Sequence, residues 1–283
     1  MRAAIKPLLG LLLLAIALSQ LELERLKETW VSADLGWFVL AIALGFLANL
    51  CCAMRWRRII NHFHFSLPGA RAVDLYFQGV AANTVLPGGI IGGDIWRAAS
   101  LAKLTMPKFE AAQTVIFDRL SGLWSLTWLS LASLLASFSY LNFAELSVAS
   151  KTYCLLLVLA AFGPTFLFWT PRARVKMLLK LAPVSLLAQG LSLSCFLSCA
   201  LSAGISAPAL DVVVFCAGIF LGAALPASIG GFGSRELASI FFLGNLGVSA
   251  ESAFLGSVLF GMTATLQGLT YLITSQLTRA IKT

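Results

Sequence analysis

Apolar runs long enough to cross a bilayer recur along the whole chain, and they limit its fold more than any other feature. Crossing the hydrocarbon core takes about 20 apolar residues in a helix. Of the 283 residues, 59% are hydrophobic and 11% are charged, whereas a soluble domain carries roughly 25% charged residues. No polar stretch between the runs is long enough for a separate soluble domain. The sequence therefore predicts a single all-α integral membrane domain over residues 1–283.

Six runs of full or nearly full span are expected as transmembrane helices, at about residues 5–21, 33–54, 121–141, 152–170, 183–203 and 250–275. The first run follows Arg2 and Lys6, as a signal peptide would. No small-x-small cleavage site follows it, and the charged amphipathic stretch "LELERLKETW" comes next. We therefore expect a retained helix rather than a cleaved leader.

The six cysteines lie inside or beside apolar runs, at positions 51, 52, 154, 195, 199 and 216. No pair of CxxC motifs and no histidine-rich set surrounds them, so their spacing fits neither a metal site nor a disulfide framework. They are expected as small buried side chains. We expect no metal site and no cofactor.

Two further apolar segments are interrupted, at about residues 69–105 and 208–247. The first contains "LPGGIIGGDIWR" and the second "LPASIGGFGSRE". Proline stops a helix, and glycine allows tight turns and close approach of other groups. We expect each segment to form a re-entrant hairpin that turns at its helix-break residues: Pro87, Gly88, Gly89, Gly92, Gly93, Pro226, Gly230, Gly231 and Gly233.

The lysines and arginines predict the orientation of the chain. With a cytoplasmic N-terminus and two re-entrant hairpins, 16 of the 20 basic residues face the cytoplasm, which leaves outside only Arg25, Lys27, Lys151 and Arg235. The positive-inside rule favours this arrangement, with both termini cytoplasmic. If both hairpins crossed the bilayer instead, the basic stretch "PRARVKMLLK", which is expected as a loop, would be exported, which the same rule disfavours.

The two interrupted segments share a pattern as well as opposite topologies. Each has Leu-Pro, then a Gly-Gly pair, then an arginine four residues after the second glycine, Arg97 in the first segment and Arg235 in the second. Interrupted helices in corresponding positions with opposite topology are typical of inverted-repeat transporters, whose site lies where the broken helices meet. Non-helical backbone at membrane depth also needs protein or a water-filled cavity around it.

Charged residues within or beside the apolar sequence indicate what such a cavity would bind. An ionised group there costs at least about 2.5 kcal/mol, so it needs a partner or water. Helix N-termini favour anions, and arginine suits the phosphate group. The candidates are Asp94, Arg97, Asp118, Arg119, Arg235 and Glu236. A purely structural alternative is that Asp94 with Arg97, and Asp118 with Arg119, form ion pairs that only lock two elements together.

Three segments, "NTVLPGGIIGGDIWRAASLAK", "FDRLSG" and "LPASIGGFGSRE", resemble in order the signature segments of the lysylphosphatidylglycerol synthetase/flippase transmembrane-domain family. The resemblance covers most of residues 40–275. It implies a multi-pass protein of the bacterial inner membrane with two re-entrant elements, and its best-known members move aminoacylated phosphatidylglycerol between leaflets. It also adds Asn83 to the substrate-binding candidates.

Bifunctional members of that family carry a soluble aminoacyl-transferase domain after the membrane part, whereas this chain ends at "TRAIKT". We therefore expect it not to make aminoacyl-lipid itself, and a separate lipid-modifying enzyme is a candidate partner. The expected substrate is an anionic or aminoacylated phospholipid, or a polyprenyl-phosphate lipid. Arg97 and Arg235 would hold its phosphate in succession, and Asp94 and Glu236 would neutralise them when the site is empty.

Other function classes fit the sequence less well. No nucleotide-binding GxxxxGK[ST] motif is present, and the net charge of +8 follows from topology without a nucleic-acid partner. An intramembrane enzyme acting on a lipid phosphate or glycolipid is the main alternative, because Asp94, Asp118 and Glu236 could supply acid–base groups. His62 and His64, in "NHFHF", are interpreted as part of a cytoplasmic interfacial segment rather than as catalytic or metal-binding residues.

A third hypothesis is a scaffold that recruits a lipid-modifying enzyme to the membrane. The basic stretches "RWRRIINHFHF" and "PRARVKMLLK" would attract anionic headgroups. A scaffold does not need two broken helices, however. The sequence therefore favours lipid transport over both alternatives.

Overall fold

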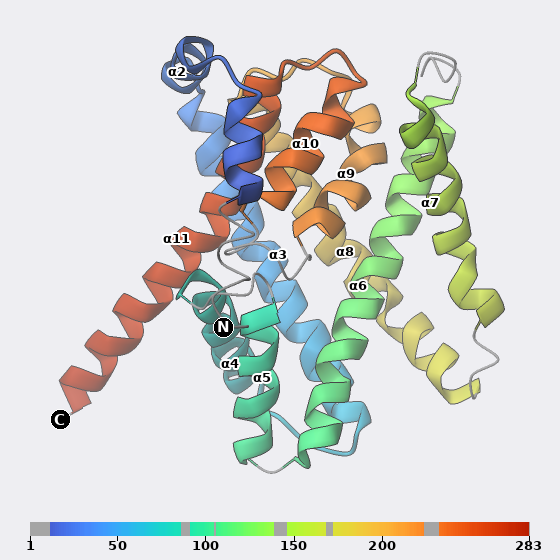
Figure 1. Cartoon of the computed structure of the whole chain (residues 1–283). Helices are drawn as coiled ribbons and strands as arrows, with labels where there is room; N and C mark the ends of the chain where they lie inside the picture. Colours follow the sequence, from blue (N-terminus) through green and yellow to red (C-terminus); the bar gives the residue numbers. More distant parts are fainter. Residues whose placement is uncertain are drawn as a thin grey trace.

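The computed structural model of the chain describes residues 12–85, 91–104, 106–138, 146–167, 172–223 and 232–282. These residues form helices without a β-strand (Figure 1). Residues 12–19 are helical, and the remaining helices are α2 (Leu23–Val31), α3 (Leu35–His62), α4 (Gly69–Val85), α5 (Ile91–Leu104), α6 (Lys108–Ser137), α7 (Val148–Leu167), α8 (Arg172–Ser202), α9 (Ala209–Ala223), α10 (Ser234–Gly244) and α11 (Ala250–Lys282).

Four helices in the described part of the chain are long and apolar enough to cross a membrane. They are Leu35–His62, Lys108–Ser137, Lys176–Ser202 and Ala250–Leu277, and α7 and α9 contain shorter apolar helices. Each of the four overlaps one predicted transmembrane run, and α7 overlaps the run predicted at 152–170. Of the run predicted at 5–21, residues 12–19 are helical. The chain is therefore an all-α, multi-pass membrane protein.

Several helices extend beyond the apolar runs that predicted them. Helix α3 continues to His62, α6 begins at Lys108, and the basic stretch expected as a loop is helical from Arg172 onward. The prediction of a loop there was wrong because hydropathy locates only the membrane-embedded part of a helix. Lysine, arginine and glutamate are good helix formers, so a helix continues easily into polar surroundings.

The two interrupted segments form two helix pairs in opposite halves of the molecule (Figure 1). Helix α4 packs on α5 in the lower half of the view, and α9 packs on α10 in the upper half. We call "lower end" the end that holds the C-terminal end of α3 and the start of α6, and "upper end" the end that holds α2 and the start of α9. Each pair has its own hydrophobic core, which includes Trp56 and Leu75 below and Phe196 and Ile219 above.

Helices α3 and α8 cross the middle of the bundle and pack on each other. Small side chains allow this contact: Ala41, Gly45 and Ala48 lie on α3, and a Cβ added to Gly45 would lie 3.3 Å from Sγ of Cys195 on α8. Small residues let helix backbones approach closely in a membrane. Of the six cysteines, all of which are free, five are buried, as the sequence predicts, and Cys51 is partly buried.

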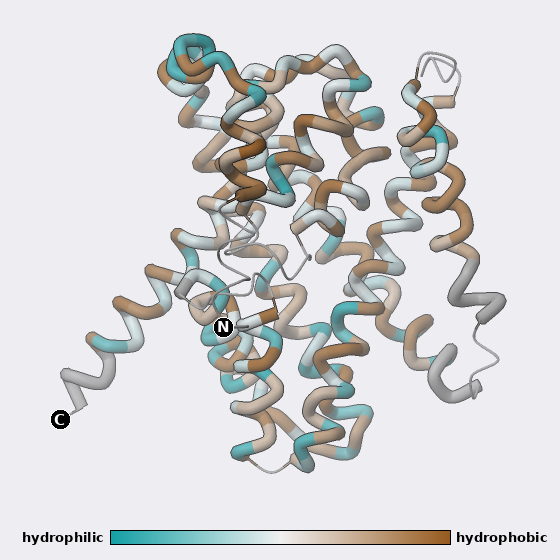
Figure 2. The backbone as a smooth tube through the Cα atoms, viewed as in Figure 1, coloured by the Kyte–Doolittle hydropathy of each residue, from teal (hydrophilic) through white to brown (hydrophobic). Residues whose placement is uncertain are grey.

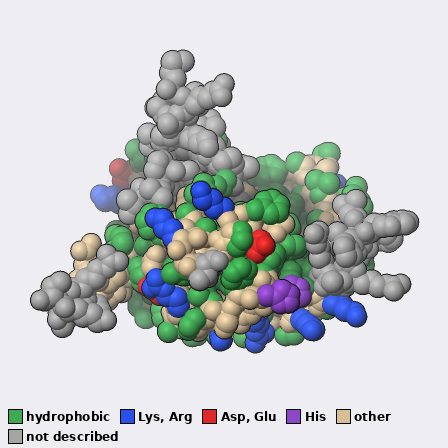
Figure 3. Space-filling model, turned by 90° about the horizontal axis from the view of Figure 1, so that it is seen from below, with side chains coloured by type: hydrophobic (Ala, Val, Ile, Leu, Met, Phe, Trp, Pro, Cys, Tyr) green, Lys and Arg blue, Asp and Glu red, His purple; other side chains and the backbone are tan. Residues whose placement is uncertain are grey.

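Polar residues gather at the two ends of the bundle. Figure 2 shows hydrophilic residues on α2 and at the lower end, with apolar residues along α7 and α9. Seen from below, lysine and arginine side chains are scattered over the lower face and acidic ones are few (Figure 3). The upper end carries a smaller basic set, with Arg25 and Lys27 on α2 and Lys151 on α7.

Candidate functional site

Helices α4 and α5 touch through their backbones. A Cβ on Gly93 would overlap the carbonyl oxygen of Gly79, and a Cβ on Gly79 would lie 2.6 Å from Cγ of Arg97. Only glycine leaves room for such an approach. The side chain of Arg97 is thereby held against α4.

Asn83 of α4 joins the two helices through a hydrogen bond to α5. Its Oδ1 accepts a hydrogen bond from the backbone N–H of Gly93, with an N···O distance of 2.6 Å. Gly93 is the third residue of α5, so its N–H has no partner within the helix. The Asn83 side chain thus supplies the cap from a different helix. Its assignment as a substrate ligand stays a prediction.

Five charged side chains from three helices meet in the lower half, and we call Arg55, Asp94, Arg97, Asp118 and Arg119 the lower ionic cluster. Asp118 on α6 accepts from Nε of Arg55 on α3 at 2.8 Å and from Nη1 of Arg97 on α5 at 3.0 Å. Asp94 accepts from Nη2 of Arg97 at 2.9 Å, and from Nε and Nη2 of Arg119 at 2.7 and 2.8 Å. The cluster therefore ties α3, α5 and α6 together.

Arg97 also stacks on two aromatic rings. Its guanidinium carbon lies 4.9 Å from the ring centroid of Trp56 and 4.7 Å from that of Tyr76. The rings come from α3 and α4, and Trp56 donates from Nε1 to the hydroxyl of Thr114 on α6. Aromatic faces stabilise a desolvated cation. The edge of the guanidinium donates to carboxylates while its face is covered by aromatic rings.

The cluster carries one excess positive charge, because three guanidinium groups face two carboxylates. Its inner members are buried: the side chains of Arg55, Arg97 and Asp118 are 4%, 3% and 1% exposed. Its outer pair is more open, since the Arg119 side chain is 46% exposed and that of Asp94 is 18% exposed. Arg119 and Asp94 therefore form the accessible rim of the cluster.

One terminal nitrogen of the Arg55 guanidinium has no hydrogen-bond acceptor. Its Nη1 is buried and makes no hydrogen bond. The same end of the guanidinium packs beside Gly122 on α6, where an added Cβ would lie 3.1 Å from Nη1 of Arg55 and 2.9 Å from Nε2 of Gln189. A buried donor left unsatisfied costs about 1–3 kcal/mol. The excess charge and this unused donor both favour a further anion or acceptor near the cluster.

A second, smaller group lies at the start of α10, and we call Arg235, Glu236 and Ser257 the upper ionic cluster. Arg235 donates from Nη2 to Oε1 of Glu236 at 2.7 Å and from Nε to the hydroxyl of Ser257 on α11 at 3.1 Å. Ser257 donates to the same glutamate oxygen at 3.0 Å. The other oxygen, Oε2, accepts from the N–H of Gly233 at 2.5 Å. Glu236 thus caps α10 and neutralises Arg235.

The two clusters share an arrangement. In each, a buried arginine on the second helix of the pair meets a nearby carboxylate on its own helix and aromatic rings. Arg235 lies 5.0 Å from the ring centroid of Phe232 and 5.8 Å from that of Phe260. Gly233, the N-cap of α10, has a backbone φ of 96°, in the region where glycine is favoured.

The sequence also suggested purely structural ion pairs, and the observed pairs differ partly from these. Asp94 does pair with Arg97, but Asp118 does not pair with Arg119. Asp118 bonds to α3 and α5, and Arg119 bonds to α5, so the ion pairs lock three helices together rather than two. The helix-break residues Gly92, Gly93 and Gly233 are described, and the first two lie in the first turn of α5. Outside the described residues lie Pro87, Gly88, Gly89, Pro226, Gly230 and Gly231.

Sequence reasoning missed the members of the site that come from other helices. Arg55 belongs to the basic stretch "RWRR" and was counted only for topology. No sequence feature marked Tyr76 or Ser257 as a member of the site. The proximity of Trp56 to Arg55 was visible, but interfacial tryptophans are common near helix ends.

Comparison with known proteins places the chain in a family. Residues 3–184 match the model of the lysylphosphatidylglycerol synthase TM region. The matched residues include the whole lower ionic cluster. The chain is also 24% identical over 119 residues to the UPF0104 membrane protein MJ1595 of Methanocaldococcus jannaschii, a match that covers 42% of this chain and 35% of that protein. Because the family model matches well over half of its residues, this chain belongs to the lysylphosphatidylglycerol synthase transmembrane-region family.

Proposed function

We propose that this protein moves a lipid with a phosphate-bearing headgroup between the two leaflets of a membrane. The lower ionic cluster carries the proposal, because it places an excess positive charge among membrane-spanning helices. Charges inside a membrane are costly and are usually retained for a substrate or ion pathway. An anionic phospholipid, an aminoacylated phospholipid and a polyprenyl-phosphate lipid all present the phosphate that such a cluster would bind.

The Arg119–Asp94 pair is the proposed point of entry. Arg119 donates to both oxygens of Asp94 through Nε and Nη2. A phosphate diester offers two oxygens in a similar arrangement, and guanidinium groups bind both ligands in this two-pronged way. A lipid phosphate would replace Asp94 on Arg119, while Asp94 keeps its bond to Arg97. The substrate's negative charge would then balance the excess charge of the cluster.

The two helix pairs would provide the path. In this proposal α4–α5 and α9–α10 are re-entrant hairpins of an inverted repeat, the lower end is cytoplasmic, and both chain termini lie on that side. The phosphate would pass from the lower cluster to Arg235 at the upper cluster while the acyl chains stay in lipid. The helix pairs in opposite halves and the ring-stacked arginine in each support this path. The proposal is for transport without covalent change to the lipid, in the bacterial inner membrane.

Replacing Arg119 tests the point of entry. We expect Arg119→Gln to slow leaflet exchange about tenfold or more, because a charge-assisted interaction with phosphate contributes at least about 1.5 kcal/mol. The measurement uses purified protein in vesicles that contain fluorescently labelled phosphatidylglycerol, with an impermeant quencher reporting the outer leaflet. Arg119→Lys keeps the charge but loses the two-pronged hydrogen bonding of the guanidinium group. Its exchange rate should lie between those of the wild type and Arg119→Gln.

Arg58→Gln is the matched control, because Arg58 is an exposed arginine of the lower end that makes no ion pair within the described residues. It should exchange lipid at the wild-type rate. An unchanged rate for a well-folded Arg119→Gln protein would rule out the proposed entry point. A covalently altered lipid in the same vesicles would instead favour the intramembrane enzyme.

Cysteine labelling tests the re-entrant arrangement. We expect Ser66→Cys and Lys103→Cys, which flank α4–α5, to react with an impermeant thiol reagent from the cytoplasmic side. Ser206→Cys and Gly244→Cys, which flank α9–α10, should react from the outside. All four residues are exposed, and the background would lack the six native cysteines. Labelling of Ser66→Cys and Lys103→Cys from opposite sides would show that α4–α5 crosses the bilayer, and the inverted repeat would be wrong.

A further inference from the structure

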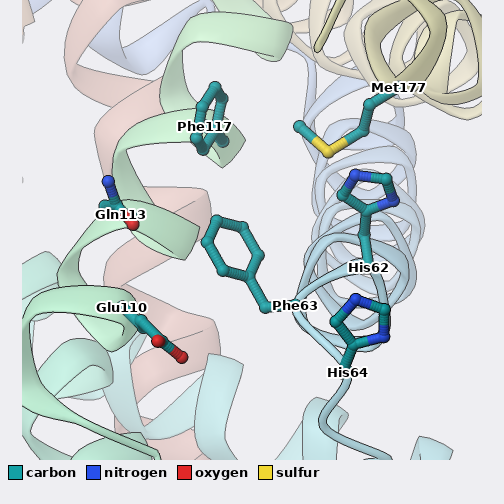
Figure 4. Close-up of a pocket in the computed structure, with 7 residues that line it drawn as sticks. All are labelled: His62, Phe63, His64, Glu110, Gln113, Phe117 and Met177. Carbon is teal, nitrogen blue, oxygen red and sulfur yellow. The ribbon is translucent and has the colours of Figure 1, made fainter. Parts of the chain in front are cut away.

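A cavity of about 320 Å³ opens at the lower end, between the end of α3 and the starts of α6 and α8. None of the residues that line it belongs to the lower ionic cluster, so it is a separate site. Figure 4 shows His62 and His64 on one wall, with Glu110 and Gln113 facing them from α6. Met177 of α8 closes the top of the view. The helices around it are three of the four candidate membrane spans, which puts the cavity near the level of lipid headgroups.

The charge of the cavity differs from that of the face around it. The lower face is rich in lysine and arginine (Figure 3), yet neither residue lines the cavity. Glu110 is partly buried and forms no ion pair with any residue of the described chain. Glu110 is the one acidic residue among those that line the cavity. The cavity is therefore suited to a cation rather than an anion.

Two phenylalanine rings complete the walls. Phe63 and Phe117 lie with their ring centroids 6.1 Å apart, and both line the cavity. The faces of aromatic rings attract ammonium groups, and the amide oxygen of Gln113 can accept a hydrogen bond from one. A carboxylate, an amide oxygen and two aromatic rings together form the environment of an organic ammonium site.

The histidines supply the opposite chemistry. An imidazole N–H can donate to a phosphate oxygen, so a headgroup that carries both phosphate and ammonium would meet complementary groups on the two walls. His64 has a backbone φ of 64°, a left-handed conformation that is uncommon for residues other than glycine. The turn after α3 thus holds a histidine where glycine would fit with less strain.

We propose that this cavity binds the headgroup of an amine-bearing phospholipid, with Glu110 as the counterion of the ammonium group and His62 and His64 facing the phosphate. The site does not depend on the transport proposal, because its lining residues take no part in the lower ionic cluster. A soluble amine could present the same ammonium group. The position at the ends of three membrane-spanning helices favours the lipid.

Native mass spectrometry of the purified full chain in detergent tests the site. The probes are short-chain phosphatidylethanolamine, short-chain phosphatidylglycerol and free ethanolamine. We expect phosphatidylethanolamine to bind most tightly, and Glu110→Gln to weaken it about tenfold while leaving phosphatidylglycerol binding unchanged. Glu24→Gln, which alters an exposed glutamate of α2 at the other end, should bind all three as the wild type does.

His64→Gly separates binding from folding. The substitution removes the imidazole and relieves the left-handed strain, so thermal stability should be equal or higher while phosphatidylethanolamine binding falls. Equal affinities for phosphatidylethanolamine and phosphatidylglycerol, or no effect of Glu110→Gln, would overturn the ammonium site. Equally tight binding of free ethanolamine would overturn its assignment to a lipid.

Discussion

Asp118→Asn is expected to destabilise the protein by about 3–5 kcal/mol, which is the usual loss when one partner of a buried ion pair is removed. The asparagine has nearly the same shape, so packing stays the same. Arg55 would lose its carboxylate partner, Arg97 would keep only Asp94, and the buried cluster would hold two excess positive charges instead of one. We expect a melting temperature lower by on the order of 10 °C, measured on purified protein in detergent.

Asp211→Asn is the matched control for this change. Asp211 is also buried, at 5% exposed, but it makes no ion pair within the described chain, and its Oδ1 has no hydrogen-bond partner. Removing its charge should therefore leave stability unchanged or raise it. If Asp118→Asn has the same melting temperature as the wild type, the bonds from Asp118 do not hold α3 and α5 to α6. The proposed role of the cluster in the fold would then be wrong.

Gly93→Ala is expected to have the other large effect. The new methyl group would overlap the carbonyl oxygen of Gly79 and the side-chain oxygen of Asn83, and a backbone atom cannot move aside as a flexible side chain can. Helices α4 and α5 would separate, the cap from Asn83 would be lost, and Arg97 would shift away from Asp118. Overpacking of this kind costs about 3 kcal/mol, and we expect leaflet exchange to be lost with it.

Gly190→Ala shows whether an added methyl group is harmful by itself. Gly190 lies within α8, and a Cβ there would meet nothing within 4 Å. Alanine favours helix by up to about 1 kcal/mol over glycine, so this variant should be as stable as the wild type or more so. The comparison uses the same thermal melt and vesicle assay. Wild-type behaviour of Gly93→Ala would contradict the close contact between α4 and α5.

The helices could be predicted because they depend on local sequence. A run of apolar residues has to be helical in a bilayer to satisfy its own backbone, and proline with glycine stops the helix wherever it stands. The two helix pairs therefore lie where "LPGGIIGGDIWR" and "LPASIGGFGSRE" predict them. The predicted helix ends were less accurate than the helix positions. Hydropathy marks where an apolar run ends, but the helix continues past that point and nothing in the hydropathy marks its last residue.

The partners within the candidate site could not be predicted from local sequence. Arg55 and Asp118 are 63 positions apart, and only the packing of α3 on α6 brings them together. Asp118 and Arg119 are adjacent in sequence, which makes them look like a pair. On a helix, neighbouring residues point about 100° apart, so they face different surroundings. The hydrogen bond from the N–H of Gly93 to Asn83 likewise joins residues of two different helices, so local sequence did not predict it.

The different directions in which Asp118 and Arg119 point from α6 have a consequence for motion. If α6 turned about its axis by one residue relative to its neighbours, the bonds from Asp118 to α3 and from Arg119 to α5 would break together. Helices α3, α5 and α6 are therefore expected to move as one rigid body, with α4 carried along by its glycine contact. Any hinge that alternates access between the two leaflets must then lie outside this unit, for example where α10 meets α11.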